Sequence, residues 1–331
     1  MSINEIQSIN LQSDTAAMNT RIDADFAAFI DYLYSLSSTQ EMCEAIRHNL
    51  RYRANKDKQT YNQIMEAYNH LRHWGEYYPG IGVRDLAENA AKAMYEHRDE
   101  LAWLYEHLGD YRSRKLLYQI LSFWLSPDPD KIKPYQERYF TQYFDIDLVP
   151  CTPNEVFVDV GAYIGDTMVS YKKVFGADGY RRIYCYEPVP ESVEYIYKNI
   201  ELFHLENIVV RPVSVSDEAK TLYLPNTAVS QSKTLMEKGE VPVETVILDE
   251  DMREPVSFIK VNVCGMEDRV LRGGQNIIRQ YHPRIAAAAY YGHDGLWSLA
   301  RTIDEIDPTY RFYLRCYGDQ PIPAEYILYA V

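Results

Sequence analysis

The sequence lacks an excess of positive charge, since its 34 lysines and arginines face 48 acidic residues and leave a net charge of −14. Such an acidic chain has no general attraction for nucleic-acid phosphates or anionic membrane surfaces. It also lacks an apolar run of about 20 residues, the length that spans a bilayer, and it begins on polar residues where a targeting segment would be apolar. These absences predict a soluble, cytoplasmic protein with neither nucleic acid nor membrane as partner.

Cysteine is scarce and dispersed. The five cysteines are odd in number, form no Cys-x-x-Cys pair, and lie at Cys43, Cys151, Cys185, Cys264 and Cys316. This usage indicates free thiols in a reducing compartment and excludes a disulfide scaffold and the common zinc motifs. We expect no metal site.

Hydrophobic residues are plentiful, at 47% of 331 residues, which is enough for two domains. Helical periodicity continues to about Leu125, and the proline-rich segment 126–134 ends it. We therefore predict a helical domain over 1–130 that serves as a cap or interaction domain. A linker and lead-in over 131–154 and a second domain over 155–331 follow.

Strand and helix patterns alternate in the second domain. Strands are predicted from 156 and at 182–186, 208–215, 221–224, 243–248, 257–263, 284–290, 310–316 and 326–331. Helices are predicted after residue 166 and at 190–205, 266–281 and 296–306. This order predicts an α/β fold with a doubly wound, mainly parallel sheet, whose site lies at the carboxyl ends of the strands.

A glycine turn follows the first of these strands in the run VFVDVGAYIGDT, residues 156–167. Gly161 and Gly165 would let a ligand approach the backbone, and Asp166 with Thr167 is predicted to cap the next helix. The middle glycine of the dinucleotide motif is absent, and the carboxylates of Asp159 and Asp166 oppose a phosphate. The turn therefore favours a ligand with positive charge, such as an ammonium or a sulfonium.

Acidic residues end the next two predicted strands. Glu187 stands about 20 residues past the glycine turn, where a carboxylate grips a ribose diol in nucleotide-binding sheets. Asp217, next to Ser216, follows the third strand and could meet an adenine amino group, although a simple turn residue explains it equally well.

Five segments together resemble the FkbM-type family of S-adenosylmethionine-dependent methyltransferases: VFVDVGAYIGDT, YCYEPVPESVEYIYKNIE, RPVSVSDEAKTLYL, VETVILDED and SFIKVNVCGMEDRVLRGG. The resemblance covers roughly 139–331 and implies a seven-stranded class I methyltransferase sheet behind an all-helical N-terminal domain. It implies S-adenosyl-L-methionine as cofactor, and O-methylation of a sugar or natural-product hydroxyl as activity. By this resemblance the donor would be held by Asp159, Gly161, Ala162, Tyr163, Gly165, Asp166, Thr167, Glu187, Pro188, Ser216 and Asp217.

The sequence departs from the family after the fourth main strand, where Lys-x-Asp-x-Glu-Gly becomes Lys260-Val-Asn262-Val-Cys264-Gly265. A carboxylate or imidazole can accept a hydroxyl proton during methyl transfer, whereas an amide cannot. The close variant of the family that this sequence resembles has a histidine at the position of Tyr291 and another near Cys316. Here His293 is displaced from the first and Cys316 occupies the second. The remaining candidates for catalytic roles are Lys260, Asn262, Cys264, Glu267, Tyr291 and His293.

Three interpretations follow. The protein could be an active methyltransferase that relies on proximity and orientation. It could be a degenerate member that acts as a cofactor-binding, scaffold or regulatory subunit, or Cys264 and Cys316 could carry thiol chemistry. The expected partners are a small-molecule or glycan acceptor, and a second copy or another protein at the helical domain. We also expect Glu187→Ala and Gly161→Val to abolish donor binding without unfolding the chain.

Overall fold

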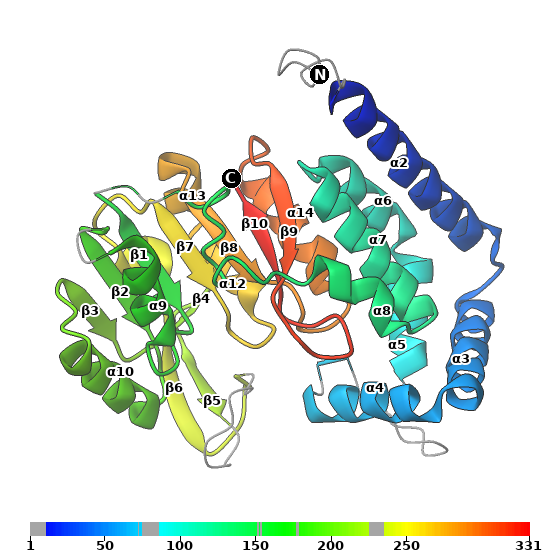
Figure 1. Cartoon of the computed structure of the whole chain (residues 1–331). Helices are drawn as coiled ribbons and strands as arrows, with labels where there is room; N and C mark the ends of the chain where they lie inside the picture. The colour runs from blue at the N-terminus through cyan, green and yellow to red at the C-terminus, as the bar shows by residue number, and fades with distance from the viewer. Residues whose placement is uncertain are drawn as a thin grey trace. The chain divides into compact units, whose positions relative to one another are not determined.

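The computed structural model describes residues 11–71, 73–74, 86–150, 152, 154–176, 179–224 and 235–331. The chain divides into two compact units, Met1–Tyr135 and Gln136–Val331 (Figure 1).

The first unit is helical, as predicted. Its elements are α2 (Leu11–Ser35), α3 (Thr39–Lys56), α4 (Lys58–Leu71), α5 (Leu86–Glu96), α6 (Arg98–His107), α7 (Tyr111–Leu125), α8 (Pro129–Ile132) and the 3-10 turn η1 (Lys133–Tyr135). Ser38 caps α3 and Asp110 caps α7, because each side chain accepts a hydrogen bond from a backbone N–H of the first turn. The apolar residues Leu117, Ile120, Leu121 and Trp124 of α7 are buried, in agreement with the helical periodicity predicted up to about Leu125.

The second unit contains a sheet of seven strands in the order β3-β2-β1-β7-β8-β10-β9. Their bounds are β1 (Val156–Val160), β2 (Arg182–Tyr186), β3 (Ile208–Arg211), β7 (Phe258–Val261), β8 (Arg284–Ala288), β9 (Phe312–Cys316) and β10 (Tyr326–Ala330). The pairs from β3 to β8 are parallel, and β10 is antiparallel to both of its neighbours. This confirms the predicted doubly wound, mainly parallel class I methyltransferase sheet.

Helices connect these strands (Figure 1). They are α9 (Asp166–Phe175), α10 (Pro190–Leu202), α11 (Leu248–Asp251), α12 (Glu267–Gly273), α13 (Gln275–Tyr281) and α14 (Gly295–Ile306). The predicted single helix 266–281 is wrong, because the chain breaks at Gly274 between α12 and α13. The Asp249 carboxylate accepts the N–H groups of Asn276 and Ile277, both at 2.9 Å, and so caps α13 from a distant segment.

The predicted strand 208–215 is also wrong. It ends at Arg211, and after Pro212 the chain enters β4 (Ser214–Ser216) in a separate sheet with β6 (Val241–Ile247) and β5 (Thr221–Leu224). Pro212 explains the break, because proline donates no backbone hydrogen bond to a ladder. This break moves β4 out of the main sheet.

An aromatic cluster forms part of the second unit's core. Phe157 on β1 stacks on Phe258 of β7 with ring centroids 4.8 Å apart, and Tyr171 of α9 stacks on Phe157 at 5.4 Å. Phe144, from the lead-in, meets Phe157 edge-on at 6.2 Å and is fully buried. The part of the lead-in around Phe144 therefore packs within the second unit.

Cys43, Cys185 and Cys316 are buried free thiols and Cys264 is half-buried, while Cys151 lies outside the described residues. Across the described ranges, no helix combines the length and apolar character needed to cross a membrane. The same residues contain no group of three or more His, Cys, Asp or Glu side chains arranged to hold a metal ion.

Candidate functional site

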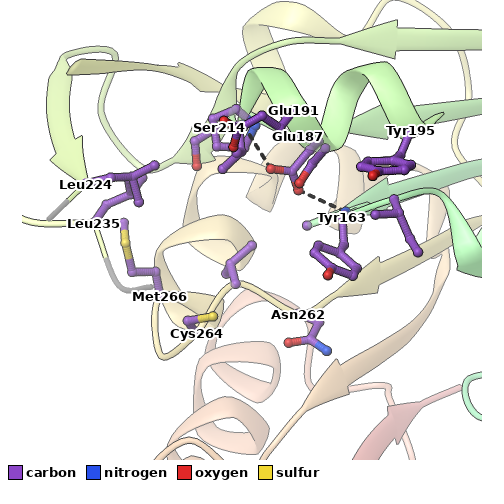
Figure 2. A pocket seen from close by; sticks show the side chains of 16 residues that line it. Tyr163, Glu187, Glu191, Tyr195, Ser214, Leu224, Leu235, Asn262, Cys264 and Met266 are labelled. Carbon is purple, nitrogen blue, oxygen red and sulfur yellow. Dashed lines mark hydrogen bonds between the residues drawn. The ribbon is translucent and has the colours of Figure 1, made fainter. Parts of the chain in front are cut away.

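A cavity lies where β1, β2 and β7 end (Figure 2). Its lining comes from the turn after β1, the β2–α10 connection, the start of α10, β4, β5 and the turn after β7. The described lining residues are Gly161, Tyr163, Ile164, Glu187, Pro188, Val189, Glu191, Ser192, Tyr195, Ser214, Leu224, Leu235, Asn262, Val263, Cys264 and Met266. The cavity therefore lies at the carboxyl edge of the sheet, where the sequence predicted the site.

Gly161 lies where the turns after β1 and β7 meet. Its φ is +78°, and a Cβ at this position would lie 2.0 Å from the backbone oxygen of Asn262. The N–H groups of Gly161 and Ala162 both donate to the Tyr186 carbonyl at 3.0 Å. Glycine is needed here because the backbones of the two turns touch.

The start of α9 differs from the prediction. Gly165, with φ of +80°, occupies the N-cap position without a side-chain cap bond in the described residues, and Asp166 is the first residue of the helix. The predicted Asp166–Thr167 cap is therefore wrong, because the left-handed Gly165 begins the helix one residue earlier. Asp166 is exposed, Ala162 and Thr167 are buried, and the described lining includes none of the three.

Glu187 lines the cavity at the end of β2, with Pro188 beside it. One carboxylate oxygen accepts the Tyr163 N–H at 2.8 Å and the other accepts the Val189 N–H at 2.9 Å. Figure 2 shows this carboxylate between Tyr163 and the start of α10. The side chain is 6% exposed, and this burial raises its pKa to about 7. Glu187 is thus a fixed acceptor that faces the cavity.

Asp159 and Lys260 form a buried ion pair beneath the glycine turn. They are partners in the register of β1 and β7, with Lys260 Nζ 2.8 Å from Asp159 Oδ1. The same ammonium donates to the Gly161 carbonyl at 2.7 Å and lies 5.3 Å from the centre of the Tyr143 ring. Burial raises the pKa of Asp159, and the Lys260 charge opposes that rise. The described lining includes neither residue, so here they support the turn from below.

Asn262 lies at the centre of a tyrosine cluster, by which we mean Asn262 with Tyr143, Tyr290 and Tyr291. The Tyr291 hydroxyl donates to Asn262 Oδ1 at 2.8 Å. Asn262 Nδ2 donates to the hydroxyl oxygens of Tyr143 at 2.8 Å and Tyr290 at 3.3 Å. Burial raises the pKa of all three tyrosines, which keeps these hydroxyls neutral. Sequence reasoning singled out Tyr291 but missed Tyr143 and Tyr290, which only the fold brings to Asn262.

Cys264 lies in a turn that Glu267 holds. The φ of Cys264 is +58° and that of Gly265 is +93°. Glu267 accepts the N–H groups of Val263 at 2.8 Å and Gly265 at 2.9 Å, and its burial raises its pKa to about 7. Cys264 Sγ lies 3.8 Å from the Tyr291 hydroxyl oxygen. Burial lowers the pKa of His293 to about 3, and His293 is not part of the described lining.

Ser216 and Asp217 also lie outside the described lining. The Ser216 hydroxyl donates to Asp217 at 3.0 Å, and a Cβ on Gly273 of α12 would lie 2.2 Å from the Ser216 carbonyl oxygen. Ser214 lines the cavity instead, because the break at Pro212 starts a new strand at Ser214. An adenine contact by Asp217 therefore remains a prediction without support from the cavity.

The first turns of α10 supply lining residues that sequence reasoning missed. Glu191, Ser192 and Tyr195 line the cavity, and their spacing places them on one face of the helix. The helical spacing of these three residues, directly after Glu187, is the sequence feature that could have indicated them as lining residues. Leu224, Leu235 and Met266 come from segments whose approach depends on the fold, and no local pattern marks them.

The cavity combines two carboxylates, Glu187 and Glu191, with an apolar wall. The apolar lining residues are Ile164, Val189, Leu224, Leu235, Val263 and Met266. Fixed carboxylate oxygens can accept hydrogen bonds from a diol, and the wall can cover an apolar ring. The arrangement fits a ligand that combines hydroxyl donors, an apolar ring and positive charge.

Residues 159–314 match the family model of the FkbM methyltransferase domain. Among solved structures, the chain is similar to methyltransferase FkbM from Methylobacillus flagellatus KT, with a TM-score of 0.64 and 19% identity. That match covers 82% of this chain, a larger share than the second unit alone, and 71% of the other chain. The fold likeness therefore extends into the helical unit.

More distant likenesses include an rRNA methylase from Streptococcus thermophilus, with a TM-score of 0.38, 12% identity and coverage of 54% of this chain and 87% of that one. Another is precorrin-6y C5,15-methyltransferase from Geobacter metallireducens GS-15, with a TM-score of 0.35, 13% identity and coverage of 56% and 85%. No curated protein matches the sequence significantly. The family match and the M. flagellatus structure agree on the α/β unit: residues 159–314 of this unit match the FkbM methyltransferase domain, and the fold is similar to that of the M. flagellatus protein.

Proposed function

We propose that this protein uses S-adenosyl-L-methionine to methylate a hydroxyl group of a sugar or natural product. The observation that carries the proposal is the Glu187 carboxylate, which is fixed by two backbone N–H groups and lines the cavity at the end of β2. This is the position at which nucleotide-binding α/β sheets grip a ribose diol. The family match supports the same chemistry.

The residues present fit this donor. Glu187 would accept hydrogen bonds from the ribose hydroxyls, and the Gly161 turn would carry the donor's amino-acid portion past the end of β1. Ile164 and Val189 offer apolar contact for the adenine ring, and Glu191 adds a second negative charge that favours a cationic ligand. When bound, the donor supplies an electrophilic methyl group on a sulfonium.

The acceptor hydroxyl would lie near Asn262. The residues there can orient a hydroxyl group better than they can take up its proton. Asn262 replaces the family carboxylate, and an amide cannot take up a proton. The tyrosines around it keep their protons, because burial raises the pKa of each hydroxyl. We therefore propose that turnover depends on proximity and orientation of the acceptor.

Calorimetric titration of the purified protein with S-adenosylhomocysteine and S-adenosylmethionine, with NAD as the control ligand, tests donor binding. We expect micromolar binding of the first two and none of NAD. Glu187→Ala should weaken S-adenosylhomocysteine binding at least about tenfold, because a charged hydrogen-bond partner is lost. Glu194→Ala, which removes an exposed carboxylate of α10 outside the described lining, should bind like the parent. Equal affinities for Glu187→Ala and the parent would contradict the site.

A second candidate function is a cofactor-binding scaffold or regulatory subunit without turnover. The amide of Asn262, hydrogen-bonded to three tyrosines in place of a carboxylate, favours this alternative. Its partner surface would be the helical unit, which exposes Tyr34 and Tyr52. Donor binding without methyl transfer to a panel of sugar and polyphenol hydroxyls would support it. Transfer of a labelled methyl group to any of them would exclude it.

Thiol chemistry has weaker support. Cys316 is fully buried on β9 and donates to the Ala324 carbonyl at 3.3 Å. Burial of this kind makes a thiol inert. Cys264 is half-buried and lines the cavity, so among the four described cysteines it is the one that a ligand in the cavity could reach.

A further inference from the structure

The turn after β7 holds a strained residue in the wall of the cavity. We name Val263, Cys264 and Gly265 the Cys264 turn. Val263 and Cys264 line the cavity, and Cys264 has a φ of +58°. Side chains other than glycine rarely adopt this conformation, so surrounding contacts must maintain it.

Glu267 provides those contacts. Its side chain is 3% exposed, and its two carboxylate oxygens accept the N–H groups on either side of Cys264, from Val263 at 2.8 Å and Gly265 at 2.9 Å. Glu267 is also the first residue of α12, where the helix dipole favours a negative charge. Glutamine would offer one carbonyl oxygen and direct an NH2 group at the second N–H, so it cannot replace both bonds.

The Cys264 turn is joined to the donor side of the cavity. It follows Asn262, whose carbonyl oxygen would lie 2.0 Å from a Cβ on Gly161. Glu187 fixes the other side of the glycine turn through the Tyr163 N–H. Each turn is thus held by one buried glutamate, and the two turns touch at Gly161. A shift of the Cys264 turn would move the wall that faces Glu187.

We propose that Glu267 is a positioning residue of the donor site, which holds the Cys264 turn in its strained conformation and thereby shapes the wall opposite Glu187. The inference rests on the proposed function only in naming the donor as the ligand. It predicts that donor binding shields the Cys264 thiol, because Cys264 and Glu187 line the same cavity.

The test uses the full-length chain and two readouts. The rate of Cys264 alkylation by N-ethylmaleimide, followed by peptide mass spectrometry, reports the turn, and calorimetry with S-adenosylhomocysteine reports the donor site. Glu267→Gln should alkylate Cys264 roughly tenfold faster and bind S-adenosylhomocysteine roughly tenfold more weakly, as expected when a buried charged partner is lost. Asp268→Asn removes the neighbouring charge of the same helical turn, which helps to raise the pKa of Glu267, so this variant should neither speed alkylation nor weaken binding.

Circular dichroism establishes that each variant is folded, and Glu267→Asp serves as the second variant if Glu267→Gln does not fold. Alkylation and affinity equal to those of the parent in the folded variant would overturn the proposal. If the parent binds no S-adenosylhomocysteine, the proposed function fails, while the alkylation rates without ligand still decide whether Glu267 holds the turn. In the parent, saturating S-adenosylhomocysteine should slow the alkylation of Cys264. An unchanged alkylation rate would overturn the placement of the Cys264 turn beside the donor.

Discussion

At the scale of single residues, the site depends on two glutamates whose negative charge is unfavourable because both side chains are buried. Glu187 and Glu267 are both buried, both accept two backbone N–H groups, and burial raises the pKa of each to about 7. The backbone hydrogen bonds favour the charged form, and desolvation outweighs them. Both groups therefore change protonation near neutral pH.

This raised pKa predicts a pH dependence of donor binding. A ribose diol donates hydrogen bonds to the deprotonated Glu187, so affinity for S-adenosylhomocysteine should rise as the pH increases through about 7 and level off above it. Below that pH the affinity should fall by up to about tenfold per pH unit, because only the ionised fraction binds well. Calorimetry from pH 5.5 to 8.5 measures the profile. In Glu187→Gln the profile should become shallower and keep only the part that Glu267 contributes through the Cys264 turn. A slope of parental size in that variant would assign the titration to a group other than Glu187.

A second prediction concerns the stability of variants at Gly161, and it differs from the expectation drawn from the sequence. Gly161→Val was expected to abolish binding without unfolding, but any Cβ there would meet the Asn262 backbone. Gly161→Ala should therefore lower the free energy of unfolding by roughly 1–3 kcal/mol for overpacking, in addition to roughly 1–2 kcal/mol for the positive φ. Urea denaturation measures it.

Gly265→Ala is the matched control. Its φ is also positive, at +93°, but the nearest atom to its Cβ would be the Tyr291 Cβ at an ordinary 3.8 Å. The free energy of unfolding of this variant should fall only by the roughly 1–2 kcal/mol that the positive φ costs. Equal losses of stability in the two variants would mean that the turns after β1 and β7 do not touch as described.

At the scale of elements, one ion pair joins the two central strands of the site. Asp159 and Lys260 stand opposite each other on β1 and β7, and their side chains are 0% and 3% exposed. A buried charge without its partner is far more costly than a broken surface pair. The pair therefore fixes the strands from which the Gly161 turn and the Cys264 turn begin.

Lys260→Met should lower the free energy of unfolding by about 3–5 kcal/mol, because Asp159 is left buried without a counter-charge. The double variant Asp159→Asn with Lys260→Met should recover a large part of this loss, which urea denaturation of both variants measures. Arg272→Met, which breaks the exposed pair with Glu305, should cost little. A double variant as unstable as the sum of its single variants would show that the two charges do not compensate each other.

At the scale of the whole molecule, the second unit begins before its first strand. Phe144 is buried against Phe157 and Phe258, and the Asp145 carboxylate accepts from the buried Arg315 of β9 at 2.8 Å. Tyr143 reaches the tyrosine cluster. Residues 143–145, which precede β1, are thus part of the second unit's core.

Expression of two fragments tests this boundary. The fragment 136–331 should give a cooperative thermal transition by circular dichroism, since it keeps the whole compact unit. The fragment 155–331 loses Phe144 and leaves Arg315 without Asp145, each of which costs roughly 3–5 kcal/mol. It should be unfolded or aggregate, because domains are stable by only about 5–15 kcal/mol. Cooperative unfolding of both fragments at the same temperature would refute the inclusion of the lead-in.

The sequence alone determined the features that local chemistry encodes. Period-two and period-3.6 patterns predicted the main strands and helices, and Gly161 and Glu187 marked the carboxyl ends of β1 and β2. Because the carboxyl ends of parallel strands meet at one edge, this was enough to place the cavity. The ordered motifs between β1 and α12 also predicted the resemblance to the FkbM methyltransferase domain that residues 159–314 match.

Tertiary structure alone decided which of these residues face the cavity. Asp159 and Lys260 meet because β1 and β7 are neighbours, and Tyr143 and Tyr290 reach Asn262 from segments far from it in sequence. The cap of α13 comes from Asp249, which no local pattern connects with residue 276. Burial, charge pairing and backbone contact depend on neighbours across the fold, so the sequence predicts the elements and the fold assigns each side chain its partner.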